Sequence, residues 1–117
     1  MERNKLFEQV KQIYGIVPDY PWRDWNAVLR HQDNNKWFAV VLEVQESKLW
    51  LPGDRIMDVV NVKSDPLLIG SLRQQSGFFP AYHMNKDSWI SIALDGSVPA
   101  DTIMNLVDIS YQLTKKK

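Results

Sequence analysis

The chain has 117 residues, with 14 Lys or Arg balanced by 14 Asp or Glu, and it contains no cysteine. This length suits one domain, residues 1–117, whose hydrophobic core is large enough for folding without disulfides or a structural metal. The absence of cysteine excludes disulfides and thiolate chemistry, and zero net charge counts against a strongly basic nucleic-acid binder. No apolar run approaches the ~20 residues of a membrane span, and no secretory signal pattern opens the chain. We expect a monomeric, cytoplasmic protein.

The N-terminal part of the chain predicts a helix followed by an ordered connection. Apolar side chains recur at helical spacing over residues 6–14, and Gly15 can end that helix in the left-handed conformation. Residues 15–26 contain two prolines and three aromatic rings, which need burial or a partner. We therefore predict an ordered segment there instead of a linker.

Three strands are predicted next. Residues 27–31 and 37–44 form a hairpin, because the Asp-Asn-Asn turn at 33–35 tolerates positive φ and favours Asx turns. Residues 45–55 are a polar excursion that contains a Trp, a Pro and a Gly. Residues 56–62 then form a third strand.

A second helix is predicted after this strand. Asp65 can cap it and Pro66 suits its first position. Gly77 is expected to stop it. Its apolar stripe consists of Leu68, Ile69 and Leu72.

The C-terminal part predicts a strand and a last helix. Residues 89–94 alternate between two faces, and Asp95-Gly96 then turns the chain. Pro99 begins the last helix. One face of that helix is formed by Ile103, Leu106, Val107 and Ser110. Consecutive strands joined by short turns predict an antiparallel sheet, so the fold class is α+β with two layers and the helices on one face.

Three segments resemble the MmcQ/YjbR family of small bacterial proteins. They are Asn-Val-Lys-Ser-Asp-Pro at 61–66, Pro-Ala-Tyr-His-Met-Asn-Lys at 80–86 with Trp89 beyond it, and Leu-Asp-Gly-Ser-Val-Pro at 94–99. The resemblance covers nearly the whole chain. It implies an α-β3-α-β2-α order, with one further strand around residues 78–82.

The resemblance also implies a function, because the family is similar to a double-wing DNA-binding fold and its members are commonly described as DNA-binding. The implied fold resembles the chaperones of secretion systems as well. This chain departs from the family pattern at Asp87, where many members carry a basic residue, and in its longer excursion at 45–55.

The leading functional hypothesis is non-catalytic binding of DNA. Basic side chains would contact phosphates, and a ring such as Tyr82 or Trp89 would stack on a base. The alternative is structural, with Pro80, Tyr82 and Trp89 anchoring the loop and Asn85 making its turn. The candidate DNA-binding residues are Lys63, Arg73, Tyr82, His83, Asn85 and Lys86.

A rival hypothesis is a protein- or peptide-binding adaptor that uses exposed aromatic side chains. Its candidate residues are Tyr20, Trp22, Trp25 and Trp50. The first three have an alternative role as a lid that closes the open face of the sheet. The basic tail Lys115–Lys117 is either a solvated terminus or a short contact for a polyanion.

Catalytic and metal-binding roles have little support in the sequence. Zinc sites need three or four ligands, whereas the chain has two histidines and no cysteine. A Ser-His-Asp arrangement could be assembled from Ser91, His83 and Asp87. No nucleophile elbow in the sequence supports it. We expect no enzyme activity, no metal and no cofactor.

Overall fold

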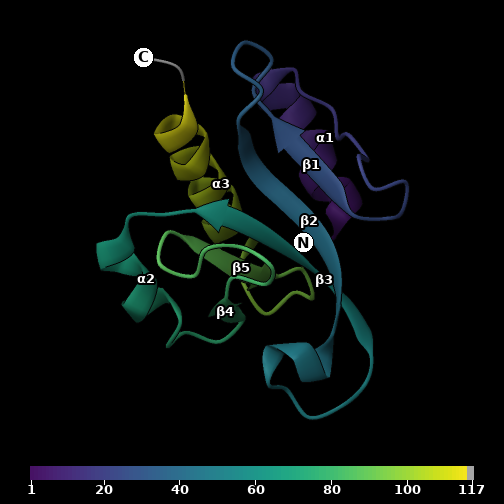
Figure 1. The fold of residues 1–117 in the computed structure, drawn as a ribbon, viewed down its shortest axis with the longest axis vertical. Coiled ribbons are helices and arrows are strands. Elements are labelled where there is room, and N and C mark those ends of the chain that lie inside the picture. The colour runs from purple at the N-terminus through teal and green to yellow at the C-terminus, as the bar shows by residue number, and fades with distance from the viewer. Residues whose placement is uncertain (116–117) are drawn as a thin grey trace.

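The structure is a computed structural model that describes residues 1–115. The elements follow the predicted order of helix, three strands, helix, two strands and helix (Figure 1). They are α1 (Arg3–Tyr14), β1 (Ala27–Arg30), β2 (Trp37–Gln45), the 3₁₀ helix η1 (Glu46–Leu49), β3 (Ile56–Lys63), α2 (Pro66–Leu72), β4 (Phe78–Pro80), β5 (Trp89–Ala93) and α3 (Ala100–Thr114).

The five strands form one sheet in the order β1-β2-β3-β5-β4, and every neighbouring pair is antiparallel. The α+β class is therefore confirmed. The extra strand that the family resemblance implied is β4, which pairs with β5 at the edge of the sheet. In the β1–β2 hairpin, Asn35 has positive φ and Asn34 Oδ1 accepts from Lys36 N, as expected for an Asx turn.

Helices cover one face of this sheet. α1 and α3 lie behind the strands in Figure 1, and the main hydrophobic core fills the space between the two layers. The apolar faces of both helices point into this core, which explains why their spacing could be predicted. The helical residues of the core are Leu6, Val10, Ile69, Ile103, Leu106 and Val107.

The second helix is shorter than predicted. Its cap is confirmed, because Asp65 Oδ1 accepts from Leu67 N at 2.9 Å and Pro66 occupies the first turn. However, α2 ends at Leu72, and a series of tight turns continues to Gly77. The stripe is narrower too, because only Ile69 is buried and Leu68 is 48% exposed. Leu72 is partly buried against the core, so the predicted stripe is confirmed for Ile69 and Leu72 and not for Leu68.

Gly77 has a different role from the one predicted. Its φ is +88°, and a Cβ there would come within 2.5 Å of the Val98 side chain. Glycine is needed because β4 starts where the chain passes close to the segment before α3.

Within residues 1–115 the opposite face of the sheet has no α-helix, only the short 3₁₀ turn η1, and we call it the face without helices. A second hydrophobic cluster lies there, beneath η1 and the loop that follows β4. We call residues 81–88 the site loop. The buried members of the second cluster are Val28, Val40, Leu42, Val44, Leu49 and Val59.

A buried polar network ties the site loop to the sheet. Asn61 on β3 and Ser91 on β5 are fully buried neighbours. Asn61 Nδ2 donates to the Tyr82 carbonyl at 2.8 Å, and Ser91 Oγ donates to Asn61 Oδ1 at 2.5 Å. Tyr82 N donates back to Ser91 Oγ at 2.9 Å. The side chains of Asn61 and Ser91 and the backbone of Tyr82 thus pair one another's donors and acceptors. The network holds the loop on the sheet and leaves none of these buried groups unpaired.

We predict that Asn61→Ala lowers the free energy of unfolding by about 1–3 kcal/mol, because Ser91 Oγ and the Tyr82 carbonyl lose their partner in a buried site. Urea denaturation measures the loss. Asn105→Ala, on the exposed side of α3, is the matched control. An equal effect of the two substitutions would contradict the role given to the network.

His31 is a second buried polar group, between β1 and the end of α3. Its side chain packs between Phe38 and Tyr111, and its Nε2 lies 2.8 Å from Thr114 Oγ1. The Thr114 hydroxyl donates to the Ser110 carbonyl, so His31 Nε2–H is the donor to Thr114. Burial lowers the pKa of His31 below its usual 6.5, and the neutral ring is favoured in the folded state.

This shift predicts that the protein loses stability as pH falls. At pH values between the lowered pKa of folded His31 and its unfolded pKa near 6.5, the unfolded chain binds more protons than the folded chain. The stability that neutral His31 contributes is therefore complete above about pH 6.5 and is lost below it. Urea midpoints at pH 7.5, 6.5 and 5.5 test this. His31→Gln should flatten the dependence, whereas the exposed His83→Gln should retain it. Equal pH dependence in both variants would argue against His31 as the titrating group.

Candidate functional site

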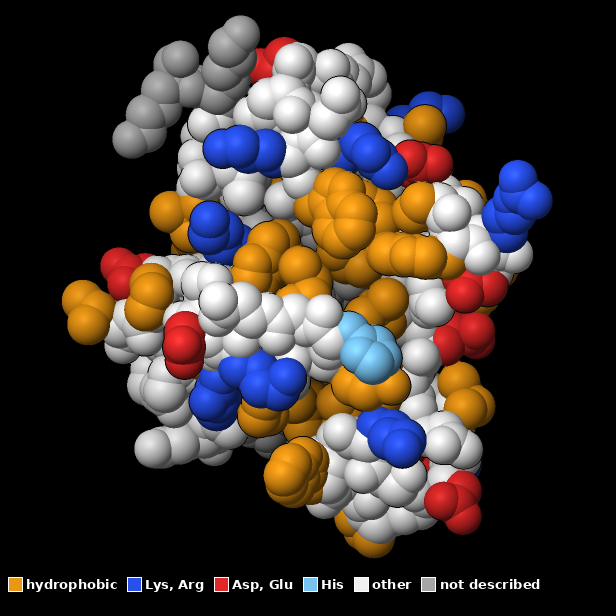
Figure 2. All heavy atoms as spheres, in the orientation of Figure 1, with side chains coloured by type: hydrophobic (Ala, Val, Ile, Leu, Met, Phe, Trp, Pro, Cys, Tyr) orange, Lys and Arg blue, Asp and Glu red, His pale blue; other side chains and the backbone are white. Residues whose placement is uncertain are grey.

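The face without helices carries two adjoining hollows. Figure 2 shows a band of hydrophobic side chains across this face, with groups of Lys and Arg on both sides of it. One hollow is a cleft of about 420 Å³ with basic residues around it. The other is a largely apolar pocket of about 330 Å³. We call them the cationic cleft and the apolar pocket.

The cationic cleft brings together segments that are distant in the sequence. Its lining comes from η1 and the residue after it, from the end of α2, from β4 and from the site loop. No Asp or Glu is among its lining residues. The lining residues are Lys48, Leu49, Trp50, Arg73, Pro80, Tyr82, His83 and Lys86.

Trp50 is held outward at one wall of this cleft. It caps η1 in the left-handed conformation, with φ +66°, and its N–H donates to the carbonyls at the start of η1. Leu49 beside it is buried in the second cluster, so the turn is anchored while the indole stays 83% exposed. An ordered, exposed tryptophan is a stacking platform.

Arg73 and Lys86 stand on the other side of the cleft and are linked. Arg73 Nη2 donates to the Lys86 carbonyl, which ties the end of α2 to the site loop. Arg73 Nε is buried and finds no acceptor among residues 1–115. The Lys86 side chain is exposed. The buried Nε is closed to a ligand, so the pair offers an anion the Lys86 ammonium group and the Nη–H groups of Arg73 that the Lys86 carbonyl does not use.

The site loop owes its shape to Asn85 and His83. Asn85 Oδ1 accepts from Asp87 N at 2.8 Å, and its carbonyl accepts from Trp89 N, so Asn85 makes the turn. His83 has φ +60°, and its ring packs on Tyr82 with centroids 3.9 Å apart. This arrangement places the imidazole where it lines both hollows.

The structure brings together only part of the predicted DNA-binding set. Arg73, Tyr82, His83 and Lys86 line the cationic cleft. Asn85 and Lys63 do not; Lys63 is at the end of β3, where it pairs with Trp89. The sequence reasoning missed Lys48 and assigned Trp50 to another group. The available signal was the Lys-Leu-Trp run at 48–50, in which a basic and an aromatic residue flank a buried leucine.

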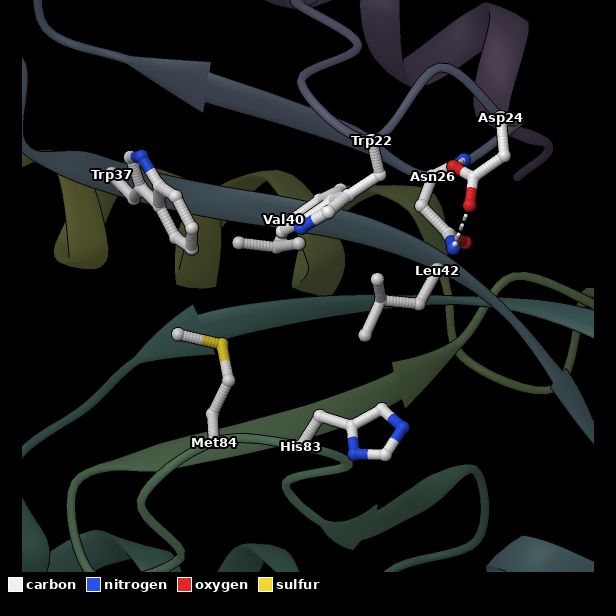
Figure 3. Close-up of a pocket in the computed structure, with 8 residues that line it drawn as sticks. All are labelled: Trp22, Asp24, Asn26, Trp37, Val40, Leu42, His83 and Met84. Atoms are coloured by element: carbon white, nitrogen blue, oxygen red, sulfur yellow. Dashed lines mark hydrogen bonds between the residues drawn. The ribbon is translucent and has the colours of Figure 1, made fainter.

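The apolar pocket lies between β2 and the site loop (Figure 3). The indoles of Trp22 and Trp37 meet edge to face at one end, with centroids 5.7 Å apart and planes at 81°. His83 and Met84 reach in from the opposite wall, as Figure 3 shows. The lining residues are Trp22, Asp24, Asn26, Trp37, Val40, Leu42, His83 and Met84.

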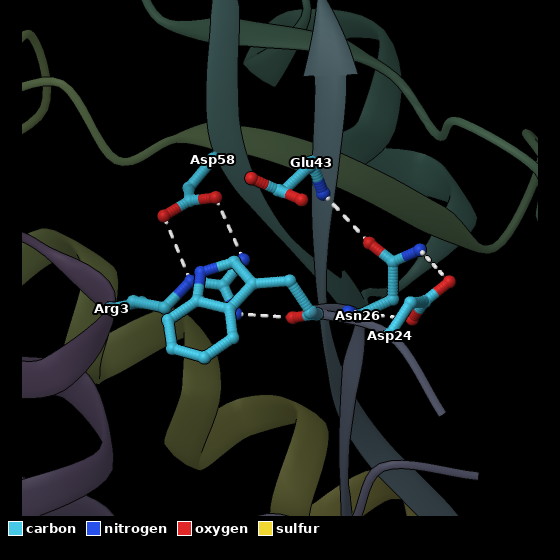
Figure 4. Close-up of polar contacts among 6 residues, drawn as sticks. Arg3, Asp24, Asn26, Glu43 and Asp58 are labelled. Carbon is cyan, nitrogen blue, oxygen red and sulfur yellow. Dashed lines mark hydrogen bonds and ion pairs between the residues drawn. The ribbon is translucent and has the colours of Figure 1, made fainter. Parts of the chain in front are cut away.

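The polar wall of the apolar pocket is fixed by short-range hydrogen bonds (Figure 4). Asp24 accepts from the backbone N and the Nδ2 of Asn26, at 2.9 and 3.2 Å. Asn26 Oδ1 in turn accepts from Glu43 N on β2 at 2.9 Å. The Asp24 carboxylate keeps unused acceptor capacity at the pocket edge.

The four predicted aromatic residues do not form one patch. Trp22 lines the apolar pocket and Trp50 the cationic cleft, whereas Trp25 lines a third hollow beside Arg3. Tyr20 stacks on Trp25. The lid of Tyr20, Trp22 and Trp25 is incomplete, because these rings are 38%, 46% and 52% exposed. These residues border the sheet and do not cover the apolar pocket.

Catalytic and metal-binding groups do not gather in the described part of the chain. Ser91 Oγ donates to Asn61 and accepts from Tyr82 N, and within residues 1–115 it makes no hydrogen bond to His83 or Asp87. Residues 1–115 contain no group of three His, Cys, Asp or Glu that could hold a metal ion. No helix in the same range is long and apolar enough to cross a membrane. Of the basic tail, Lys115 is exposed after α3, and Lys116 and Lys117 lie outside the described residues.

Solved structures share this fold closely. A crystal structure of a protein from Pseudomonas syringae matches with a TM-score of 0.95 and 40% identity, and covers 98% of this chain and 100% of that one. The Deinococcus radiodurans protein DR2400, with a DUF419 domain, matches with a TM-score of 0.76 and 25% identity, over 99% of this chain and 80% of that one.

Sequence relatives agree with the structural match. The chain is 40% identical to the uncharacterized protein YyaQ of Bacillus subtilis (strain 168) over 117 residues, 98% of this chain and 99% of YyaQ. It is 38% identical to the uncharacterized protein YjbR of Escherichia coli (strain K12) over 90 residues, 76% of this chain and 67% of YjbR. The YjbR family model matches residues 11–113. The chain therefore belongs to the YjbR family, as its three motifs predicted.

Proposed function

We propose that this protein binds single-stranded DNA in the cationic cleft and carries out no reaction on it. The observation that carries the proposal is the convergence of Lys48, Arg73 and Lys86 around the exposed indole of Trp50. Binding of single strands combines backbone contacts from basic side chains with stacking of bases on aromatic rings. The cleft offers both.

A single strand suits this site better than a duplex. The chain has no net positive charge, and three basic side chains line the cleft, so few phosphate contacts are available to hold a duplex. Three cations contribute a modest electrostatic attraction, and stacking on Trp50 supplies the rest. In a duplex the base faces are already stacked on each other and cannot reach this ring.

Binding without catalysis is supported by the positions of the titratable groups. His83 and Asp24 line the same pocket but reach it from opposite walls (Figure 3). Asp24 is hydrogen-bonded to Asn26 and not to His83, so no acid–base pair is formed.

A peptide-binding adaptor is the second candidate, and one observation favours it. Tyr20, Trp22, Trp25 and Trp50 are each more than one third exposed, and exposed aromatic rings are typical of peptide-binding surfaces. Their distribution over three hollows weakens it, because a peptide would need one continuous groove. Binding to an apolar peptide would be insensitive to salt, which separates the two candidates.

The first prediction from this proposal concerns salt. A dye-labelled oligonucleotide of about 12 nucleotides, within the site size of single-strand binders, should bind more tightly than its duplex in fluorescence anisotropy. With three phosphate contacts, the slope of log K against log salt should be roughly −2, a loss of about 20-fold between 50 and 200 mM salt. Lys86→Ala should make the slope shallower by about 0.7. The matched control is Lys11→Ala, on α1 behind the sheet.

A second substitution separates stacking from charge. Trp50→Ala should weaken binding about 5- to 140-fold, corresponding to about 1–3 kcal/mol for one stacked base, and leave the salt slope unchanged. Leu67→Ala, which removes an 89% exposed apolar side chain on α2, is the control. No binding at 50 mM salt, or equal effects of Lys86→Ala and Lys11→Ala, would refute the proposal.

A further inference from the structure

We propose that the apolar pocket takes one unstacked base of the bound strand, whose phosphates lie in the cationic cleft. This inference rests on the proposed function and names what that function leaves open, which is the part of the strand that the protein recognises. It assigns a role to Trp22 and Asp24, which lie outside the cleft.

The shape and lining of the pocket suit a flat ring. Its volume of about 330 Å³ lies at the small end of the range for small-molecule sites, roughly 300–1,000 Å³. Val40 and Leu42 form an apolar floor on β2, and the two perpendicular indoles of Trp22 and Trp37 offer one face and one edge. A ring placed there would gain stacking and edge-to-face contacts together.

The two hollows adjoin at His83, which lines both. A ligand that fills both therefore needs a flat apolar group next to an anion. Nucleotides have this chemistry, because every base is attached to a phosphate through its sugar. An aromatic residue of a peptide would fill the apolar pocket but leave the basic side chains of the cleft without a counter-charge.

Charge sets the direction in which such a ligand lies. The carboxylate of Asp24 stands at the rim of the apolar pocket, so a phosphate is repelled there and attracted to the cleft, where Lys86 and Arg73 stand. The free acceptor capacity of Asp24 suits an exocyclic amino group, which adenine and cytosine carry and hypoxanthine lacks at the same position. We expect a preference for amino-bearing bases.

The test uses free nucleosides, so that the pocket is examined apart from the cleft. In ¹⁵N-labelled protein, the indole N–H signals of the five tryptophans serve as separate probes. Adenosine should shift the signals of Trp22 and Trp37 and leave that of Trp25 in place. Inosine should bind several-fold more weakly. Deoxyadenosine monophosphate should bind several-fold more tightly than adenosine, and Lys86→Ala should remove this gain.

Two variants keep the interpretation clear. Trp22→Ala should abolish the shift of Trp37 by adenosine, whereas Leu67→Ala should not change it. Asp24→Asn should reduce the preference for adenosine over inosine without loss of the ring contacts. Both can be checked for folding by the unchanged signals of the core.

The outcomes distinguish this inference from the function on which it rests. If oligonucleotides bind with dependence on Lys86 while neither nucleoside nor nucleotide moves Trp22 and Trp37, the inference is overturned and the proposed function stands. If adenosine moves both indoles and no oligonucleotide binds, the proposed function fails and the inference about a strand fails with it. A response to N-acetylphenylalaninamide in place of adenosine would overturn it in favour of a peptide.

Discussion

The site loop is held on the sheet by the buried amide of Asn61. This amide stands in the middle of the sheet, where a polar side chain is costly unless every donor and acceptor is paired. The pairing comes from Ser91 on the next strand and from the backbone of Tyr82. The amide therefore fixes where the site loop leaves the sheet, and the loop carries the His83 and Lys86 side chains to the two hollows.

The opposite wall of the apolar pocket depends on Arg3, a buried cation at the start of α1. Its guanidinium makes two bonds to the Asp58 carboxylate, at 2.8 and 2.7 Å, and donates a third to the Trp25 carbonyl (Figure 4). The Trp25 ring covers it at 4.9 Å. A buried ion pair costs desolvation, so its value lies in position more than in stability. It locks the segment that carries Trp22 and Asp24 against the helix layer.

The fold could be predicted because its signals are local. Gly15 ends α1 and Asp65 caps α2, each through contacts within a few residues. The alternation in β5 and the spacing in α3 reflect which side faces the core. The predicted end of α2 was wrong because Gly77 was interpreted as a helix stop. Glycine is required there because Val98, a neighbour distant in sequence, leaves no room for a side chain. The lid is incomplete for a similar reason, since Trp25 packs on Arg3 and Trp22 packs on Trp37, and both of these partners are distant in sequence.

The sequence by itself determined the α+β class and the order of the elements other than β4, since these depend on spacing along the chain. The resemblance of its three motifs indicated the family, β4 and the residues of the site loop. Only the tertiary structure decided that Lys48 and Trp50 meet Arg73 and Lys86 across one cleft, and that Lys63 stands apart. The physical reason is that the sheet brings η1, the end of α2 and the site loop to one face. Tertiary packing brings these residues together, and their spacing along the chain does not predict it.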